Sequence, residues 1–463
     1  MQFDHIFYPK SVAIIGASPQ IPYFIKPFME PEYDGKLFLV NPNRDEVLGL
    51  KCYPRLQDIE EPVDYAIFSI PAKYTSGALR DCVDKGVKAV HIFTSGFSET
   101  GKEGGKELEE ELLKIASDKL RIIGPNCMGV YCPESGMTFT NGMSKEAGEV
   151  GFISQSGAHA TQVPLAGMMR GLRFSKVVSY GNAIDLDSSD FLEYLGDDPK
   201  TSVILLYVEG VKDGRKFMNA LKSACNKKPV VVLKGGRTKE GARSASSHTG
   251  SLAGSAKIWE ALFKQTGAIS VRNIEELIDT ALAFSRCPLP RGRNVSMITF
   301  SGGSSVVQTD ACIDMGLNMP VFGEEAIRKL EKITSSVGGG ITNPLDSYHS
   351  YFRPGGLLEV ANIIAPEDYI DSMMLEVSAT YTRMRDEGMH DEFITNVTEV
   401  KRYIQEEVGE PFMVALPDTC YTEERAKLQE AFQREGIAVY PSIDRAARSI
   451  FNMYRYQRFL KKK

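Results

Sequence analysis

The sequence predicts an α/β protein built from three doubly wound domains. Apolar runs of strand type alternate with segments of helical periodicity along most of the 463 residues, and this alternation builds parallel sheets. Three of the strand-like runs lead into turns of small and hydroxyl-bearing residues, at Gly16–Ser18, Gln155–Ala158 and Ser301–Ser305. The length is enough for about three domains of ~150 residues each.

The first domain is expected at residues 1–130. A buried strand begins at Ser11 and ends in the small-residue turn at Gly16. Helices, including Ser76–Lys85 and Glu103–Ser117, separate the strands that follow. These further strands are expected at Lys36–Val40, Tyr65–Ile70, Ala89–Phe93, Leu120–Ile123 and, as a short one, near Val130.

Ligands of a doubly wound sheet bind beyond the carboxyl ends of its strands. We therefore expect a cofactor to contact the turns that follow the strands of this domain. Those turns hold Gly16, Ala17 and Ser18, then Asn41, Pro42 and Arg44, then Pro71, Ala72 and Lys73, then Ser95 and Gly96, and finally Asn126 and Cys127.

The end of the second strand indicates the type of cofactor. An NAD site needs Asp or Glu there to bind the ribose hydroxyls. This chain has Asn41 and Asn43 instead, with Arg44 adjacent. These residues disfavour an NAD-dependent oxidoreductase and suit a ligand that carries extra phosphate. For Cys127, a packed thiol is favoured over a catalytic one.

A second α/β domain is expected at residues 131–287, with strands at Val150–Ser154, Phe174–Ser179, Ser202–Val208 and Pro229–Lys234. Ser156 and Gly157 lie where the first of these strands turns into a helix. The free N–H groups and the dipole of a helix N-terminus bind phosphate, although a plain tight turn remains an alternative. Glu209 ends the third strand, where a carboxylate is either solvated or able to orient an imidazole.

The fourth strand of this domain leads into a stretch of small and hydroxyl-bearing residues around His248, from Arg243 to Ser255. A helical pattern follows from Ala256, so His248 is expected on a loop between a strand and a helix. A histidine on such a loop can carry a phosphoryl group as a nucleophile. A flexible serine-rich linker with an incidental histidine explains the composition equally well.

A third α/β domain is expected at residues 288–463, after a linker-like stretch at Arg286–Arg293. Gly302, Gly303 and Ser304 repeat the strand–turn–helix design of the second domain and are predicted to bind phosphate. The span Met384–Glu407 is predicted to be a loop and a solvent-facing helix. Strands are predicted at Asn294–Phe300, Glu359–Ala365, Tyr369–Val377, Pro411–Leu416 and Ile437–Val439.

Three segments of the second domain carry a family resemblance. The residues Ser247–Ser255 (SHTGSLAGS), with Val208–Phe217 (VEGVKDGRKF) and Lys228–Arg237 (KPVVVLKGGR) before them, resemble the alpha subunit of ADP-forming acyl-CoA synthetases. The likeness to succinyl-CoA synthetase is more distant. The resemblance covers nearly the whole chain and implies a Rossmann-like coenzyme A domain followed by two flavodoxin-like, succinyl-CoA synthetase-like domains.

The resemblance also implies an activity and residue roles. His248 is expected to be phosphorylated during turnover, Glu209 to contact it, and two helix N-termini to hold phosphate. The reaction is acyl-CoA, ADP and phosphate to carboxylic acid, CoA and ATP, through an acyl phosphate. Serines at 304 and 305 depart from the more glycine-rich turn of the family.

A partner subunit is expected, because the sequence has no ATP-grasp region and no G-x-x-x-x-G-K-[ST] loop. The resemblance implies that a beta subunit of ATP-grasp type binds ATP or ADP with Mg²⁺, in an α₂β₂ assembly. A CoA- or acyl-CoA-binding regulatory subunit is the alternative. The acyl group cannot be read from the sequence, although residues 138–143 and His159 are plausible near it.

The composition excludes several other classes of protein. With 54 basic and 60 acidic residues, a net charge of −6, nothing favours nucleic-acid binding. No apolar run reaches the ~20 residues of a membrane span, and the first residues do not form a signal peptide. The eight cysteines form no C-x-x-C pair, so we expect no metal site, reduced thiols and a cytoplasmic location.

Overall fold

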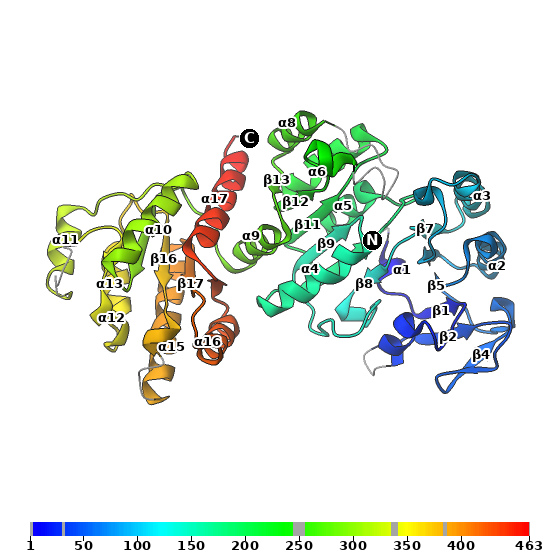
Figure 1. The fold of residues 1–463 in the computed structure, drawn as a ribbon, viewed down its shortest axis with the longest axis horizontal. Helices are drawn as coiled ribbons and strands as arrows, with labels where there is room; N and C mark the ends of the chain where they lie inside the picture. The colour runs from blue at the N-terminus through cyan, green and yellow to red at the C-terminus, as the bar shows by residue number, and fades with distance from the viewer. Residues whose placement is uncertain (1–2, 30–32, 244–254, 335–340, 383–386, 463) are drawn as a thin grey trace. The chain divides into compact units, whose positions relative to one another are not determined.

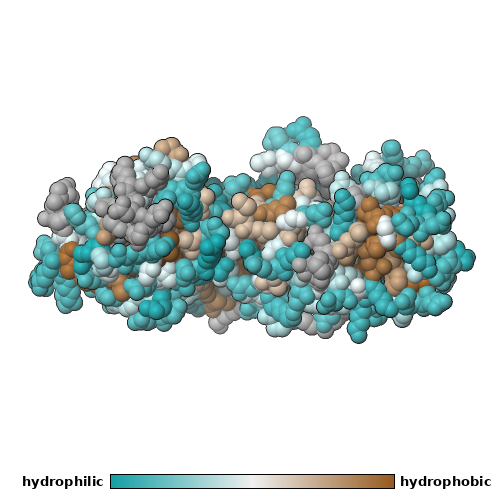
Figure 2. Space-filling view, turned by 90° about the horizontal axis from the view of Figure 1, so that it is seen from below, coloured by the Kyte–Doolittle hydropathy of each residue, from teal (hydrophilic) through white to brown (hydrophobic). Residues whose placement is uncertain are grey.

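The computed structural model describes residues 3–29, 33–243, 255–334, 341–382 and 387–462. The chain forms two compact units, Met1–Leu277 and Ile278–Lys463. The face shown in Figure 2 is mostly hydrophilic, with apolar colour in separate patches. In the part of the chain that the structure describes, no helix combines the length and the apolar character needed to cross a membrane.

The first unit begins with a seven-stranded sheet in the order β3-β4-β2-β1-β5-β6-β7. All five residues of its central strand β1 are buried, as expected of a strand covered on both faces. Every pairing is parallel except β3 with β4. The strands are β1 (Ser11–Ile15), β2 (Lys36–Val40), β3 (Glu46–Val47), β4 (Leu50–Tyr53), β5 (Tyr65–Phe68), β6 (Ala89–Ile92) and β7 (Arg121–Ile123).

Helices α2 (Thr75–Lys85) and α3 (Gly105–Ala116) pack side by side on this sheet (Figure 1). Their apolar stripes join one core with the strands, because Leu79, Cys82 and Leu112 are fully buried in it. The short helix α1 (Asp4–Phe7) precedes β1. The carboxyl ends of β1, β2 and β5 are thereby left open to a ligand.

The second sheet of this unit has six strands in the order β13-β12-β11-β9-β10-β8. One prediction is wrong here: the strand near Val130 does not extend the first sheet but pairs antiparallel with β10. The loop 124–128 turns the chain out of the first sheet before this strand begins. The strands are β8 (Gly129–Tyr131), β9 (Val150–Ser154), β10 (Phe174–Ser179), β11 (Val203–Val208), β12 (Val230–Lys234) and β13 (Ile269–Val271).

Helices cover both faces of the second sheet, with α5, α6 and α8 on one face and α4 on the other (Figure 1). The Ser156 side chain caps α4 by accepting from the His159 N–H at 3.4 Å, a standard use of serine at this position. The helices are α4 (Gly157–Met169), α5 (Ser188–Asp197), α6 (Gly214–Lys227), α8 (Ala256–Thr266) and α9 (Ile274–Arg286).

The boundary between the two units falls inside α9. The part of α9 after Leu277 packs with the C-terminal helix α17 (Ile443–Leu460). Arg445 donates to the Asp279 carboxylate at 2.9 Å, and Asn452 donates to the Thr280 hydroxyl at 3.0 Å. These buried polar contacts make most of α9 part of the second unit.

The second unit holds a five-stranded parallel sheet in the order β15-β14-β16-β17-β18. Helices α10 and α17 pack together on one face, and α11, α12, α13 and α15 lie on the other (Figure 1). The strands are β14 (Val295–Thr299), β15 (Leu345–Asp346), β16 (Ser372–Glu376), β17 (Phe412–Ala415) and β18 (Ala438–Tyr440). The further helices are α10 (Gly302–Asp314), α11 (Glu324–Leu330), α12 (Tyr348–Phe352), α13 (Gly356–Ile364), α14 (Ala379–Thr382), α15 (Glu387–Arg402), the π-helix Tyr403–Val408 and α16 (Thr422–Arg434).

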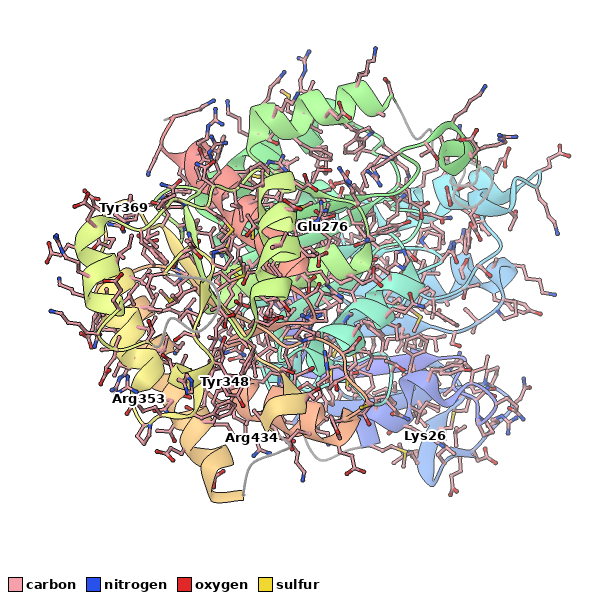
Figure 3. The ribbon with its side chains drawn as sticks, turned by 60° about the vertical axis from the view of Figure 1, so that its left-hand side comes forward. Lys26, Glu276, Tyr348, Arg353, Tyr369 and Arg434 are labelled. Atoms are coloured by element: carbon pink, nitrogen blue, oxygen red, sulfur yellow. The ribbon has the colours of Figure 1, made fainter. Side chains whose placement is uncertain are left out.

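The predicted strand Glu359–Ala365 is wrong, because this segment belongs to α13. Leu357, Val360, Ala361 and Ile364 are fully buried, at the spacing of one helix face. Glu359 does not belong to that buried set and pairs with Arg353, which is labelled in Figure 3; Arg353 Nη1 is 3.1 Å from Glu359 Oε1. A short apolar run fits a strand and a buried helix equally well.

The predicted solvent-facing helix in 384–407 exists as α15, but it also has a buried face. Phe393, Val397 and Val400 on α15, and Ile404 beyond it, are at most 3% exposed and join the core of the second unit. Charges of both signs on the outer face masked this apolar stripe in the sequence.

Candidate active site

A cavity of about 640 Å³ opens at the carboxyl ends of β1, β2 and β5. Its walls include Gly16, Asn41, Pro42 and Pro71, four of the residues predicted to bind a cofactor. Gly16 has φ +88°, and a Cβ there would lie 2.5 Å from the Ser69 carbonyl oxygen. Only glycine fits this turn, which brings the backbone to the cavity wall.

The Asn41 side chain holds the turn after β2 from within. Its Nδ2 donates to the Ala17 carbonyl at 2.9 Å, and its Oδ1 accepts from the Asn43 N–H at 3.0 Å. An acidic side chain at this position could not donate to Ala17. The amide therefore fixes two neighbouring strand ends together, and it occupies the position at which an NAD site has a carboxylate for the ribose hydroxyls.

The other predicted residues of the first three turns lie close to the cavity in the chain but are not in its wall. Ser18 and Arg44 both hydrogen-bond to Gln20, Arg44 at 3.4 Å. Ala72 and Lys73 begin a 3₁₀ helix, and the Lys73 ammonium lies 4.8 Å from the centre of the Tyr74 ring. Tyr74 and Arg55 also line the cavity and were not predicted. Tyr74 lies beyond the turn that follows β5, and Arg55 follows β4, a strand that was not predicted.

The last two predicted turns are held by groups of the chain itself. Glu99 Oε1 accepts from the Gly96 N–H at 2.6 Å, next to Ser95. Asn126 has φ +58°, and its Nδ2 is 3.5 Å from Asn182 Oδ1. Cys127 is 3% exposed, and burial raises the pKa of its thiol. This state matches the packed thiol that was favoured over a catalytic one.

The second predicted centre lies at the carboxyl edge of the second sheet, where α4 begins. Gln155 precedes the capping Ser156, and its Oε1 accepts from the Glu209 N–H at 2.7 Å and from the Gly210 N–H at 3.3 Å. The start of α4 is thereby joined to the end of β11. The first-turn N–H groups of a helix have no partner within the helix, so Ser156 and Gly157 present donors at this edge.

Glu209 is buried at this edge, with 6% of its surface exposed. Its Oε1 accepts from the Tyr207 hydroxyl at 3.0 Å. Its Oε2 is buried and has no hydrogen-bond partner among the described residues. A buried carboxylate oxygen of this kind is costly unless a donor reaches it, so the arrangement suits an incoming N–H group.

Three further side chains surround this carboxylate, and the sequence indicated a role for only one of them. His159, on the first turn of α4, packs edge-on against Tyr207 with ring centres 4.3 Å apart. Tyr207 and the buried Lys234 at the end of β12 were not predicted. His159, Tyr207 and Lys234 line a second cavity of about 440 Å³, with Arg237 and Arg272 further out. The backbone of Arg272 is held by Glu276 (Figure 3), whose carboxylate accepts from the Arg272 N–H at 2.9 Å.

His248 lies outside the described residues, and its predicted position on a loop is therefore not tested. The segment that carries it leaves β12 at Gly235 and returns at α8. A Cβ on Gly235 would lie 2.8 Å from the Tyr207 hydroxyl oxygen and 3.2 Å from Glu209 Cγ. The chain leading to His248 therefore starts in contact with Glu209.

In the second unit, Gly302, Gly303 and Ser304 form the first turn of α10. Ser301 caps this helix by accepting from the Ser304 N–H at 3.3 Å. Glu376, at the end of β16, accepts from Gln308 Nε2 at 2.6 Å. Burial raises the pKa of this carboxyl, against the opposing effect of Gln308.

The two segments suggested near the acyl group line different cavities. Residues 138–143 include Thr138, Thr140 and Asn141 in the wall of a cavity of only about 40 Å³. His159 lines the larger cavity beside Lys234. The structure therefore does not bring these two segments together in one pocket.

Comparisons with known proteins agree with this arrangement. A CoA binding domain matches residues 10–133, and a succinyl-CoA ligase like flavodoxin domain matches residues 147–284. The alpha subunit of ADP-forming acetate–CoA ligase II of Pyrococcus furiosus is 37% identical over 442 residues, which cover 94% of each chain. The ADP-forming acetate–CoA ligase I of Archaeoglobus fulgidus is 43% identical over 347 residues, 74% of this chain.

The chain spans about half the length of the A. fulgidus protein, because the match covers 50% of it. A solved structure, acetyl-coenzyme A synthetase 1 of Ca. Korarchaeum cryptofilum in complex with phosphate and ADP, matches with a TM-score of 0.85 and 30% identity over 99% of this chain and 98% of that one. A CoA-type domain joined to a succinyl-CoA ligase-like domain, together with relatives of this similarity and coverage, shows that the chain belongs to the ADP-forming acyl-CoA synthetase family.

Proposed function

We propose that the chain is the CoA-binding, phosphohistidine-bearing subunit of an ADP-forming acyl-CoA synthetase. One observation carries the proposal above the others. The buried Glu209 carboxylate, with one oxygen unpartnered among the described residues, stands between the start of α4 and the root of the segment that bears His248. A regulatory CoA-binding subunit would have no use for such a costly carboxylate.

The proposed reaction has three steps. Phosphate attacks the thioester carbon of acyl-CoA, and the thiolate of CoA leaves as an acyl phosphate forms. The neutral imidazole of His248 then attacks the phosphorus, and the carboxylate leaves. The phosphohistidine finally gives its phosphoryl group to ADP. Each step is reversible, so ATP, a carboxylic acid and CoA also yield acyl-CoA, ADP and phosphate.

The residues of the second sheet have distinct roles in these steps. Glu209 Oε2 accepts the N–H of one imidazole nitrogen, which leaves the lone pair of the other nitrogen to attack. The same carboxylate stabilises the cationic ring of the product. The first-turn N–H groups of α4, at Ser156 and Gly157, stabilise the phosphoryl oxygens. CoA is proposed to occupy the cavity around Gly16, Asn41 and Pro71.

The nucleotide site is assigned to a partner. Relatives of this chain include separate alpha subunits and a longer protein, half of which is covered by the match. We therefore propose a beta subunit of ATP-grasp type that binds ADP or ATP with Mg²⁺, an α₂β₂ assembly and a cytoplasmic location. The acid is proposed to be a small carboxylic acid, because relatives are named for acetate and 4-hydroxybutyrate.

An ATP-synthesis assay tests the function. A panel of acyl-CoAs is incubated with ADP and phosphate, with this chain alone and with the chain plus its nucleotide-binding subunit. ATP is expected only from the complex and only with some acyl-CoAs. Synthesis by the chain alone would place a nucleotide site in this sequence. Absence of synthesis, combined with tight acyl-CoA binding, would favour the regulatory alternative.

Calorimetry on the whole chain tests the cofactor. CoA is expected to bind and NADH is not, because the turn after β2 has Asn41 in place of an acid. Gly16→Ala is expected to abolish CoA binding, since its Cβ would overlap the Ser69 carbonyl. Gly49→Ala is a matched control: Gly49 also has positive φ, +81°, but nothing lies within 4 Å of its Cβ position. Tighter binding of NADH than of CoA would overturn this assignment.

A further inference from the structure

Lys234 is a buried cation, and the part of the chain that the structure describes does little to balance its charge. It is the last residue of β12, only 3% of its surface is exposed, and its aliphatic chain is enclosed by the sheet. Its ammonium donates to the Gly235 carbonyl and lies 5.1 Å from the centre of the Trp259 ring. An ammonium has three N–H donors, and the described residues provide one acceptor, the Gly235 oxygen.

Two other lysines, Lys176 in β10 and Lys228 just before β12, are held in more ordinary ways. Lys176, also buried, forms an ion pair with Asp198 at 2.7 Å. Lys228, at the opposite end of the strand that Lys234 ends, donates to the carbonyl oxygens of Leu195 and Asp198. Burying a charge without a close partner costs several kcal/mol, so the setting of Lys234 favours a further, anionic partner.

The surroundings of Lys234 indicate where that partner binds. β11 and β12 pair in parallel, with Val208 opposite Lys234, so Glu209 and Lys234 end neighbouring strands at one edge. Lys234 also lines the cavity of about 440 Å³ with Tyr207 and His159. Among the described residues, Glu209 has an unpartnered acceptor and Lys234 has donors without an acceptor, and a phosphoryl group on an imidazole requires both.

We propose that Lys234 binds the phosphoryl group while it is transferred beside Glu209. This inference rests on the proposed function and adds a catalytic residue to it. As the imidazole nitrogen forms the P–N bond, the bond between phosphorus and the acyl oxygen breaks, and its electron pair leaves with the carboxylate. The acyl phosphate dianion and neutral imidazole become a carboxylate and a phosphohistidine of net charge −1. No proton is gained or lost, and Lys234 stabilises the phosphoryl oxygens throughout.

The groups that face Lys234 give the proposal a pH signature. They are Glu209 and Tyr207 from β11 and His159 from α4, with Arg237 and Arg272 at the rim of the cavity. Burial lowers the pKa of Lys234 to about 8, although Glu209 opposes the shift. Transfer needs the protonated amine, so the rate should fall as the pH rises through that value. An arginine, with a pKa above 12, should remove this decline.

Single-turnover labelling tests the proposal. The whole chain is incubated with [³²P]phosphate and the acyl-CoA that labels the wild type best, and the rate of protein labelling is followed from pH 6 to 10. Lys234→Met is expected to slow labelling roughly 100-fold. Lys234→Arg should keep at least a tenth of the rate and lose the decline above pH 8. Lys228→Met, at the other end of the same strand, should label at the wild-type rate.

The possible outcomes distinguish a failure of this inference from a failure of the proposed function. If no acyl-CoA labels the wild type, the proposed function fails and the role of Lys234 fails with it. If the wild type is labelled and Lys234→Met matches its rate, the function stands and Lys234 has no part in it. Should Lys234→Met fail to fold, the pH profile of Lys234→Arg decides, and a decline identical to that of the wild type overturns the proposal.

Discussion

The two strand–turn–helix elements β9–α4 and β14–α10 share a backbone design but differ in charge. In both, a serine caps the helix, Ser156 in the first unit and Ser301 in the second. The buried groups around α4 include a carboxylate, Glu209, and an amine, Lys234. Those around α10 are acidic: Glu376 is buried, and Asp346 Oδ2 lies 3.7 Å from the Cβ position of Gly302.

This difference teaches that a helix N-terminus alone does not define a phosphoryl-transfer site. Among the described residues of the second unit, no lysine or arginine is buried. The donors of α10 therefore attract an anion that the neighbouring acids repel, whereas α4 has a cation beside it. Only the first element combines helix donors, a free carboxylate oxygen and a buried ammonium.

The largest expected effect is a difference in labelling rate between variants of the two buried carboxylates, Glu209 and Glu376. Glu209→Gln keeps the shape and one acceptor oxygen but loses the charge, so it should slow labelling by acyl-CoA and [³²P]phosphate roughly 100-fold while CoA affinity stays the same. Glu376→Gln should change the rate less than about twofold, since no lysine or arginine is buried among the described residues of the second unit to bind a phosphoryl group beside it. Equal rates for Glu209→Gln and the wild type would remove Glu209 from the site.

A smaller effect, on stability and labelling rate, is expected when one methyl group is added at Gly235. In Gly235→Ala, the Cβ would press on the Tyr207 hydroxyl and Glu209 Cγ, so we expect a loss of about 1–3 kcal/mol in unfolding free energy and slower labelling. Gly303→Ala meets no atom within 4 Å and should be neutral or stabilising by up to ~1 kcal/mol. Denaturant unfolding checks both, and a neutral Gly235→Ala would show that the strand ends are not tightly packed.

The smallest effect concerns the stability of the second unit against pH. Because burial raises the pKa of Glu376, ionising this group costs more in the folded than in the unfolded chain. Wild-type stability should therefore fall as the pH rises through that pKa. Glu376→Gln should be the more stable protein at pH 8, and the difference should vanish below about pH 4. A difference that persists in acid would exclude ionisation as its cause.

The sequence was sufficient for most of the central strands and for the turns that follow them, but not for β3, β4, β13 and β15. The alternation of strand-like and helix-like segments, with small residues after the strands, predicted β1, β9 and β14. The turns at Gly16, Gln155 and Ser301 lie at the carboxyl ends of these strands, as expected. Glu359–Ala365 was misread because a seven-residue apolar run does not distinguish a strand from a buried helix. The strand near Val130 was misplaced because pairing partners are set by the tertiary fold.

The site was only partly visible in the sequence. Ser156, Gly157 and Glu209 could be found because each ends a strand or begins a helix. Lys234 and Tyr207 could not, because their importance comes from burial and from neighbours on another strand, Tyr207 through its hydrogen bond to Glu209. A lysine at the end of an apolar strand was the one available signal, and most such lysines are solvated.

The most direct test of the account is the identity of the phosphorylated residue. The chain is labelled with [³²P]phosphate and an acyl-CoA, and the label is mapped and tested for stability in acid and base. The account predicts an acid-labile, base-stable label on His248 that is absent from His248→Ala. A label that persists in His248→Ala, or one that base removes as expected of a carboxyl phosphate, would contradict it.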